Sequence, residues 1–326
     1  MNRRTFIGTA AATLVAVPLA AVAQHSGKIR RIGLLMLGGP PTQAELPLDL
    51  GPLRNLGWIE GQNLVIERRY AGDRAELLQR FAAEFVQLKV EIIVTAGTDA
   101  TVAAKEATTQ IPIVMYSAGD PVGAGLVASL SRPGGNVTGF SILSTVLRVK
   151  GLEVLHDLLP GAQRVGEFVN PTNPFFRVAR KEYEDAYRSL GMQPFFVEVA
   201  TAGELENGFS ELARRQAQAL VVPGDNLFEA NSSWIMRTAL DRALPTAVAD
   251  RDMVEDGGLV SYTYSAAERE RRVAYFIDKV LRGAKPADLP IEQPTKFELV
   301  INLKTAKALG LAIPQSLLLR ADEVIQ

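Results

Sequence analysis

The sequence predicts an α/β protein of two doubly wound parallel-sheet lobes, joined by a hinge that the chain crosses three times. Short continuous apolar runs alternate with segments of helical periodicity, a pattern typical of buried parallel strands and the helices that connect them. The series begins near residue 30 and begins again after Phe140. In a chain of 326 residues, two such series favour two compact domains over one.

The first series should form most of the first lobe. Its expected strands are 32–37, 63–70, 90–95, 113–116 and 137–140. Helices are expected at 75–88, where apolar residues recur on one face, and at 99–108, with Thr98 as the N-cap. A helix within 43–57 should be short or broken, because Pro47 and Pro52 interrupt it.

The second series repeats this alternation. Its expected strands are 163–169, 195–199, 219–222, 246–249 and 259–262. Helices are expected at 144–159 and 178–190, and near 203–216 and 231–243. The strands end in polar loops, and such loops gather at the carboxyl edge of a parallel sheet, where open α/β folds bind their ligands.

The last part of the chain does not continue as a third lobe. Segment 266–281 predicts an amphipathic helix, and its charged run at 268–272 is expected to be a solvated face. A proline-rich connection leads to a strand at 297–301, a short helix at 305–309 and a segment at 313–318. We expect the helix to return to the first lobe and the strand to join the second. The lobes would then comprise 30–141 with 264–288, and 142–263 with 289–326.

The N-terminus has the pattern of a twin-arginine export signal, expected over residues 1–23. Arg3 and Arg4 precede an apolar run that ends in small residues at Ala23. The uninterrupted run is about 15 residues, shorter than the roughly 20 that a spanning helix needs, which argues against a membrane anchor. Because no cysteine follows the cleavage point, no lipid anchor is expected either. We therefore expect a protein that is free in the periplasm.

Composition argues against several classes of function. A formal net charge of −1 without a basic cluster argues against nucleic-acid binding. The chain has no cysteine and two histidines, which leaves little material for a metal site or a Ser-His-Asp nucleophile. His156 is expected within a helix, where it is packed structurally or exposed to solvent rather than catalytic. Phosphate loops, HExxH, GxSxG and a dinucleotide fingerprint are absent. We therefore predict no cofactor, no metal and no catalytic residue.

Hydroxyls, carboxylates, amides and aromatic rings remain at strand ends in both lobes, which is typical of a binding site rather than a catalytic one. The stretch 113–139 is central, because Asp120 lies in a turn after an apolar strand. Asp120 could pair with a cationic group of a ligand, or accept backbone hydrogen bonds in its own turn. Thr98 could help to hold an anion at a helix start, or be an ordinary cap. The predicted ligand-binding residues are Thr98, Ser117, Asp120, Tyr116, Asn170, Asp225, Asn226, Phe228, Asp250 and Tyr262.

Within this set the predicted roles differ. Asp225 is a second candidate partner for a cationic group, and Ser117 a second candidate for an anion. The three aromatic side chains, Tyr116, Phe228 and Tyr262, would supply apolar contact unless they pack in the core.

Several motifs resemble those of the ABC-transporter substrate-binding family that includes tryptophan- and tyrosine-uptake components. They are DPVGAGLV at 120–127, RPGGNVTG at 132–139, GWIEGQN at 57–63, GGLVSY at 257–262 and PTKFELVIN at 294–302. The resemblance implies the type I periplasmic-binding fold, a ligand between the lobes, and delivery to a membrane permease with a separate ATPase. It also implies ligand contacts from the loops after Thr95, Tyr116, Val169, Val222 and Ala249. The contribution of the first loop, 38–42, stays open, because Pro47 and Pro52 depart from the family pattern.

Together these features predict a monomeric receptor for an amino acid or a small aromatic or carboxylate compound, without catalysis of its own. A ligand sensor of the same fold, feeding a signalling receptor, is the first alternative. An exported α/β enzyme is the second, and the missing nucleophile, base and metal ligands count against it.

Overall fold

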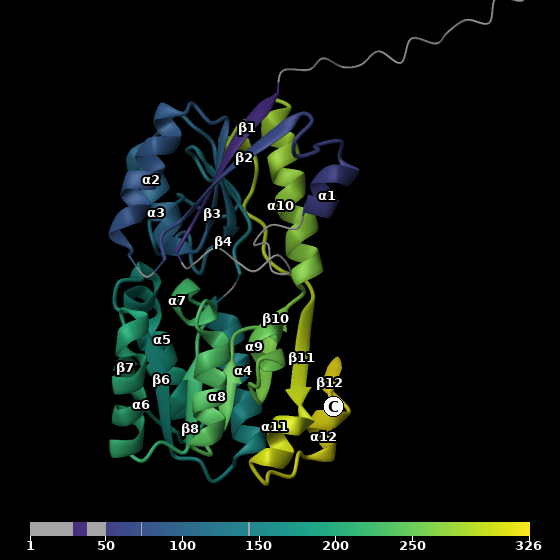
Figure 1. The fold of residues 1–326 in the computed structure, drawn as a ribbon. Coiled ribbons are helices and arrows are strands. Elements are labelled where there is room, and N and C mark those ends of the chain that lie inside the picture. Colours follow the sequence, from purple (N-terminus) through teal and green to yellow (C-terminus); the bar gives the residue numbers. More distant parts are fainter. Residues whose placement is uncertain (1–28, 38–49, 73, 143) are drawn as a thin grey trace, which may run out of the picture.

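The computed structural model describes residues 29–37, 50–72, 74–142 and 144–326, which form two α/β lobes, each built on its own sheet (Figure 1). The predicted export signal, the first loop at 38–42 and residues 43–49 of the segment expected to hold a short or broken helix lie outside the described residues. Across the described part of the chain, no helix has both the length and the apolar character needed to cross a membrane.

The first lobe contains a five-stranded parallel sheet in the order β2-β1-β3-β4-β5. Its strands are β1 (Arg30–Met36), β2 (Leu64–Tyr70), β3 (Ile92–Ala96), β4 (Ile113–Ser117) and β5 (Val137–Gly139). Helices α2 (Glu76–Gln87) and α3 (Thr98–Ala107) pack in one core on one face of the sheet. Helices α1 (Leu50–Asn55) and α10 (Ala266–Leu281) contribute to a second core on the other face.

The second lobe contains a seven-stranded sheet in the order β12-β11-β10-β9-β8-β6-β7. Its strands are β6 (Arg164–Val169), β7 (Gln193–Glu198), β8 (Ala219–Val222), β9 (Thr246–Val248), β10 (Val260–Tyr264), β11 (Phe297–Asn302) and β12 (Glu323–Ile325). Its helices are α4 (Ser144–Leu158), α5 (Pro174–Ser189), α6 (Leu205–Arg214), α7 (Asn226–Glu229), α8 (Ser232–Asp241), α9 (Arg251–Glu255), α11 (Leu303–Ala308) and α12 (Gln315–Leu318).

One strand of this second sheet departs from the predicted parallel arrangement. Strand β11 pairs antiparallel with β10, whereas the other neighbouring strands pair parallel. To pair in parallel with β10, the chain would have to cross back over the second sheet, usually through a helix packed on that sheet. The helix between β10 and β11 is α10, which packs on the first lobe instead. The chain reaches β11 from α10, which packs on the first lobe, so it enters the second sheet from the opposite end.

The first five strands of each lobe have the same order, 2-1-3-4-5, as in flavodoxin-like folds. In this order the chain turns one way from the first strand and the other way from the third. Adjacent loops therefore diverge at the carboxyl ends of those two strands and leave a crevice, which is where such sheets bind ligands. In the second lobe, this crevice lies between the ends of β6 and β8.

The connections between the lobes run beside one another. Ser141 N donates to Glu292 O at 2.8 Å, and Glu292 N donates to Gly139 O at 3.0 Å. These two bonds join the first connection to the third, and Ser265 N donates to Lys296 O at 3.1 Å, which joins the second connection to the third. In Figure 1, α10 lies against the first sheet, whereas β11 is a strand of the second. Short paired connections of this kind allow two rigid lobes to move as a hinge.

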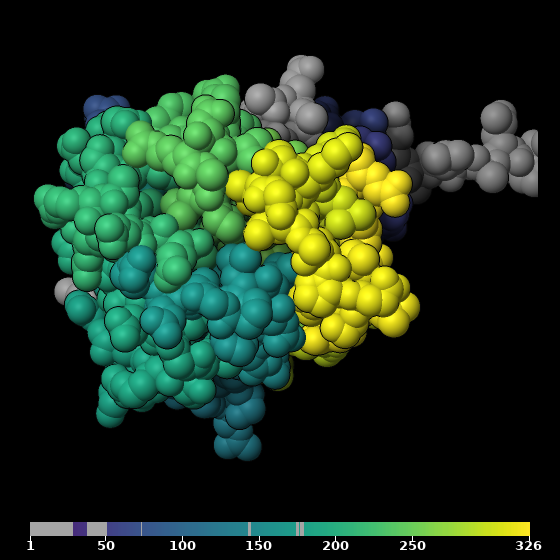
Figure 2. Space-filling model, turned by 90° about the horizontal axis from the view of Figure 1, so that it is seen from below, coloured from purple at the N-terminus to yellow at the C-terminus, as the bar shows by residue number. Residues whose placement is uncertain are grey.

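The C-terminal segment completes the second lobe. Seen from below that lobe, residues coloured yellow cover one side of its surface beside the teal and green residues (Figure 2). Leu317 of α12 is fully buried in the same core as Leu155 of α4, and Arg320 Nη1 contacts Asp157 Oδ2 at 3.5 Å. The last residues therefore pack as part of the lobe.

Gly139, where the chain leaves the first lobe, should not tolerate a side chain. Its φ is +124°, and a Cβ there would lie 2.4 Å from Met115 O and 2.5 Å from Met115 N. Because the clashing atoms are backbone, they cannot move away without breaking the β4–β5 pairing. We expect Gly139→Ala to lower the free energy of unfolding by about 2–4 kcal/mol, measured by urea denaturation. Gly135→Ala, where nothing lies within 4 Å of the added Cβ, is the matched control and should be near neutral.

Candidate ligand-binding site

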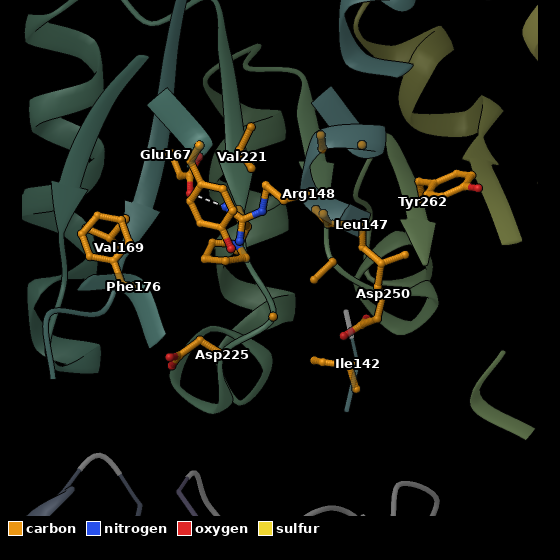
Figure 3. Close-up of a pocket in the computed structure, with 18 of the residues that line it drawn as sticks. Ile142, Leu147, Arg148, Glu167, Val169, Phe176, Val221, Asp225, Asp250 and Tyr262 are labelled. Carbon is orange, nitrogen blue, oxygen red and sulfur yellow. Dashed lines mark hydrogen bonds and ion pairs between the residues drawn. The ribbon is translucent and has the colours of Figure 1, made fainter. Parts of the chain in front are cut away.

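A cavity of about 90 Å³ lies at the crevice of the second sheet (Figure 3). Its walls come from the ends of β6, β8 and β9 and from α4 and α5. Many of the lining side chains are apolar, including Ile142, Leu147, Leu152, Val169, Phe176 and Val221. Mostly apolar walls with a few polar groups at defined places are typical of a small-molecule site.

One end of the cavity lies deep in the lobe and is formed by a buried ion pair. Nη1 of Arg148, on α4, donates to Oε1 of Glu167, on β6. Tyr187 OH donates to the other oxygen of this carboxylate at 2.6 Å. The Arg148 guanidinium lies over the Tyr183 ring, 4.7 Å from its centroid. Burial raises the pKa of Tyr183 to about 12, so this phenol stays protonated.

The opposite end of the cavity lies against the first lobe and is acidic. Ile142 and Tyr264 line the cavity and also pack against the core of the first lobe. Figure 3 shows Asp225, Asp250 and Ile142 at this end, away from Arg148 and Glu167. Asp225 and Asp250 are N-caps of α7 and α9, and accept from Leu227 N and Met253 N, both at 2.9 Å.

Four carboxyl groups converge where the lobes meet. Asp99 belongs to α3 of the first lobe, and Asp225, Glu229 and Asp250 belong to the second. Burial, and then the charge of Asp225, raise the pKa of Asp99 to about 7. The pKa of Asp225 is raised by burial. The pKa of Glu229 is also raised, by burial and then by the charges of Asp250 and Asp225. Negative charges held this close need a cation when the lobes are together.

Arg269 of α10 faces this acidic cluster from the hinge. Its positive charge acts on both Glu229 and Asp250 and opposes the rise of their pKa values. The guanidinium lies 4.2 Å from the Tyr116 ring centroid and donates from Nη1 to Tyr264 OH at 2.7 Å. Its Nε is buried and has no hydrogen-bond partner among the residues that the structure describes. Arg269 thus joins side chains from both lobes and keeps one donor unused.

Four of the predicted binding residues line the cavity. They are Asn170, Asp225, Asp250 and Tyr262. Asn170 Nδ2 donates to Asp225 Oδ1 at 3.1 Å and so helps to orient the carboxylate. Tyr262 lies at the rim, where its ring stacks on Phe297 with centroids 6.1 Å apart. The structure therefore brings together four of the six predicted residues of the second lobe.

The predicted residues of the first lobe lie outside this cavity and link loops. The prediction that Thr98 is the N-cap of α3 was wrong, because Thr98 is the first helical residue and Gly97 is the cap. Thr98 Oγ1 accepts from Gly119 N at 3.2 Å, and Ser117 Oγ accepts from Gly97 N at 3.2 Å. Asp120 Oδ1 accepts from Val122 N and Gly123 N at 3.1 and 2.9 Å. Asp120 therefore accepts backbone hydrogen bonds in its own turn, which was the alternative to a role in binding a ligand.

The remaining predicted residues have other surroundings. Phe228 is fully buried and stacks on Phe168 with centroids 5.8 Å apart, so it belongs to the core and offers no face to a ligand. Tyr116 is covered by Arg269, and its OH donates to Glu270 Oε1. Asn226 joins the lobes, because its Nδ2 donates to Ala96 O at 2.9 Å.

Sequence reasoning missed Asp99, Arg148, Glu167, Glu229 and Arg269. The expectation that the run 268–272 is a solvated face was wrong for Glu270, which is 8% exposed, and for Arg269. Helical spacing could have found both, because residues 269 and 270 lie four and three positions, respectively, before the buried Val273. Arg148 and Glu167 lie inside a predicted helix and strand, where the sequence gives no comparable signal.

Within the described ranges, no group of three or more His, Cys, Asp or Glu side chains has the arrangement of a metal site. One of the four carboxyl groups comes from the first lobe and three come from the second. Their chemistry suits a positively charged group of a ligand that carries several hydrogen-bond donors, such as an ammonium group.

Comparisons with known proteins agree with this architecture. A tyrosine-binding protein from Clostridioides difficile (strain R20291) is 28% identical over 287 residues, which are 88% of this chain and 82% of that protein. The structure of an ABC domain in complex with L-Trp from Streptococcus pneumoniae matches with a TM-score of 0.82 and 26% identity, over 91% of this chain and 99% of that one. A ligand-free, open substrate-binding protein from Clostridium difficile matches with a TM-score of 0.62 and 26% identity, over 91% and 99%.

The fold-level match extends further. A leucine-binding protein from Thermotoga maritima has a TM-score of 0.54 at 15% identity, over 80% of this chain and 78% of that one, which supports the type I periplasmic-binding fold. The profile of the ABC transporter substrate-binding proteins matches residues 50–325. The chain therefore belongs to the family of ABC transporter substrate-binding proteins.

Proposed function

We propose that this protein binds an L-amino acid with an aromatic side chain between its two lobes and delivers it to the permease of an ABC importer. The observation that carries the proposal is the acidic cluster of Asp99, Asp225, Glu229 and Asp250, which comes from both lobes and faces Arg269. An amino acid brings an ammonium group to the carboxylates and a carboxylate to the arginine. Relatives that bind tyrosine or carry L-Trp support this ligand class.

The proposed orientation follows from the two ends of the cavity. The ammonium group pairs with the second-lobe carboxylates near Asp225 and Asp250, which the ligand then neutralises. The carboxylate is directed toward Arg269, whose buried Nε has a donor to give. The side chain enters the apolar part of the cavity, between Leu147 and Val169. In this arrangement, charged groups bind the ammonium and carboxylate that all amino acids share, and the shape of the apolar walls selects the side chain.

The relative arrangement of the lobes is consistent with a closed, ligand-competent form. The two relatives above have the same identity and coverage, yet the L-Trp complex superposes better than the open, ligand-free structure. The contact between Asn226 and Ala96 O joins the lobes directly. Closure around the ligand is how a two-lobed receptor buries a small polar molecule.

The proposed cellular role rests on the family and the N-terminus. Binding proteins of importers act outside the inner membrane, which fits the twin-arginine pattern at Arg3 and Arg4. We propose a periplasmic receptor without catalysis of its own, because its relatives are binding proteins. Deleting its gene should abolish uptake of the labelled amino acid by cells, and uptake that persists unchanged would contradict the delivery role.

The ligand is tested by calorimetry on the purified protein with L-tyrosine, L-tryptophan and L-phenylalanine. We expect at least one to bind, with thermal stabilisation of about 2.7 kcal/mol at 100 times its dissociation constant. Matched analogues without the ammonium group, such as 3-(4-hydroxyphenyl)propionate, should bind at least about a hundredfold more weakly, because the carboxylates then stay unpaired. Equal affinity for an amino acid and its deaminated analogue would contradict the proposal.

A further inference from the structure

Arg148 and Glu167 are buried together at the deep end of the cavity. Their side chains are 11% and 1% exposed. Taking an ion pair out of water usually costs more than the pairing returns, so such a pair is a weak device for stability. Here it forms the deep end of the cavity, and apolar side chains such as Leu147 and Val169 separate it from the acidic end at the proposed ammonium site. A role in recognising the ligand is a better explanation of its position.

The two charges do not face the cavity equally. Glu167 accepts from Arg148 with one oxygen and from Tyr187 with the other, and its side chain is almost fully covered. Arg148 is the more exposed partner, and its guanidinium has five N–H donors. Among the described residues, Arg148 donates its side-chain hydrogen bond to Glu167. The deep end therefore presents donors to a ligand.

The guanidinium is also fixed in orientation. It lies over the Tyr183 ring on one side, 4.7 Å from the centroid, and is held by Glu167. Glu167 in turn is held by the Tyr187 hydroxyl from α5. A donor group that three elements hold in place can select by hydrogen bonding, because little is lost in ordering it.

The size of the cavity narrows the ligand further. Its volume of about 90 Å³ is several times the ~10–15 Å³ that a cavity needs to hold one water. It is smaller than a ~150 Å³ engineered cavity known to hold benzene, so one six-membered ring would fill it with modest widening. A two-ring indole would need more room.

We infer that Arg148, held by Glu167 and Tyr183, is a specificity-determining residue that accepts only side chains with a hydrogen-bond acceptor at the tip, and so selects tyrosine over phenylalanine and tryptophan. The inference rests on the proposed function, since it assigns the side-chain end of the same site. A phenol oxygen can accept from Arg148, whereas an indole N–H can only donate and a phenyl ring can do neither. Phenylalanine would leave the guanidinium donors unpaired in a site closed to water.

The first test needs no variant. Calorimetry on the purified protein should give tyrosine an affinity at least about thirtyfold higher than phenylalanine, because a site built to bond a hydroxyl rejects the analogue without it. Tryptophan and 4-amino-L-phenylalanine, whose tips donate, should also bind more weakly than tyrosine. Equal affinities for tyrosine and phenylalanine would overturn the inference.

The second test removes both charges at once, so that neither is left unpaired. In Arg148→Met with Glu167→Gln, tyrosine should fall to the affinity of phenylalanine, while phenylalanine stays within about threefold of its original value. Arg215→Met is the matched control: this arginine also covers an aromatic ring, Phe195, at 4.1 Å, but lies outside the cavity. It should leave the tyrosine preference unchanged.

The outcomes separate this inference from the proposed function. If no amino acid binds the original protein, the proposed function fails. If amino acids bind but the double variant weakens all of them equally, Arg148 acts on the common part of the ligand, and the inference fails while the proposed function stands.

Discussion

Arg269→Met should weaken binding of the amino acid at least about a hundredfold. The substitution keeps the length and apolar bulk of the side chain but removes the cation that faces Glu229 and Asp250. Truncating one member of a buried charge pair commonly costs about 2–5 kcal/mol, much of it from the charges left unpaired. Arg269 also holds Tyr264 at 2.7 Å and covers Tyr116, so its loss loosens the contact between the lobes. Calorimetry with the best ligand measures the effect.

A matched control separates this role from a general effect on α10. Arg271 lies two positions along the same helix but is exposed, so Arg271→Met should change the affinity by less than about twofold. Thermal unfolding of both variants without ligand shows whether the helix still packs through Val273 and Phe276. An Arg269→Met protein that is folded and binds the ligand as tightly as the original would contradict the assignment of Arg269 to the site.

The fold could be predicted from the sequence because its signals are local. The amphipathic helix 266–281 and the strand 219–222 have the bounds of α10 and β8, since apolar periodicity and flanking breakers define both. Strand β12 and helices α7 and α9 were not predicted, because three to five residues carry too little periodicity. The antiparallel β11 depends on where the chain returns from, which is a property of the whole fold.

The site was predicted correctly only for polar residues in the loops that follow strands. Asn170, Asp225 and Asp250 lie within three residues after the ends of strands, and the rule that ligands bind beyond the carboxyl ends found them. Asp120 follows the same rule, yet its carboxylate caps its own turn, and only coordinates distinguish these two uses of an aspartate. Arg269 was missed because the run 268–272 was taken as solvent-exposed as a whole, without asking which of its residues lie on the buried face of the helix.

Two electrostatic features of this molecule now have distinct roles. The deep Arg148–Glu167 pair lies within one lobe and is already neutral, so it should act on ligand choice without affecting how the lobes move. The acidic cluster is shared between the lobes, and its repulsion exists only when they meet. Selectivity and closure should therefore respond to different substitutions and to different conditions.

The shared cluster predicts that the closed form without ligand is lost as pH rises. In the closed form, burial and then Asp225 raise the pKa of Asp99 from 3.8 to about 7. When the lobes part, this carboxyl meets water and its pKa returns toward its ordinary value. A group whose pKa is raised in one form stabilises that form fully at pH below its ordinary pKa. This contribution is then lost as pH increases through the raised value.

The expected size of this effect is large. Each proton that must leave lowers the ratio of closed to open protein about tenfold per pH unit, so this ratio should fall several hundredfold between pH 4 and pH 7. Because the chain has no cysteine, two introduced cysteines, one on each lobe, can carry a fluorescent pair that reports the distance between the lobes. The ligand-free protein should be closed near pH 4.5 and open near pH 8.

The bound protein should behave differently, because the ligand's ammonium group takes the place of the protons. With saturating amino acid the lobes should stay closed at both pH values, and binding near pH 6 should release protons, seen as a buffer-dependent heat in calorimetry. Asp99→Asn with Asp225→Asn removes the repulsion, so this variant should stay closed without ligand at pH 8. The same interlobe distance of the original protein at both pH values would show that the acidic cluster does not control closure. It would also contradict the proposal that the ligand's ammonium group replaces the protons of the cluster.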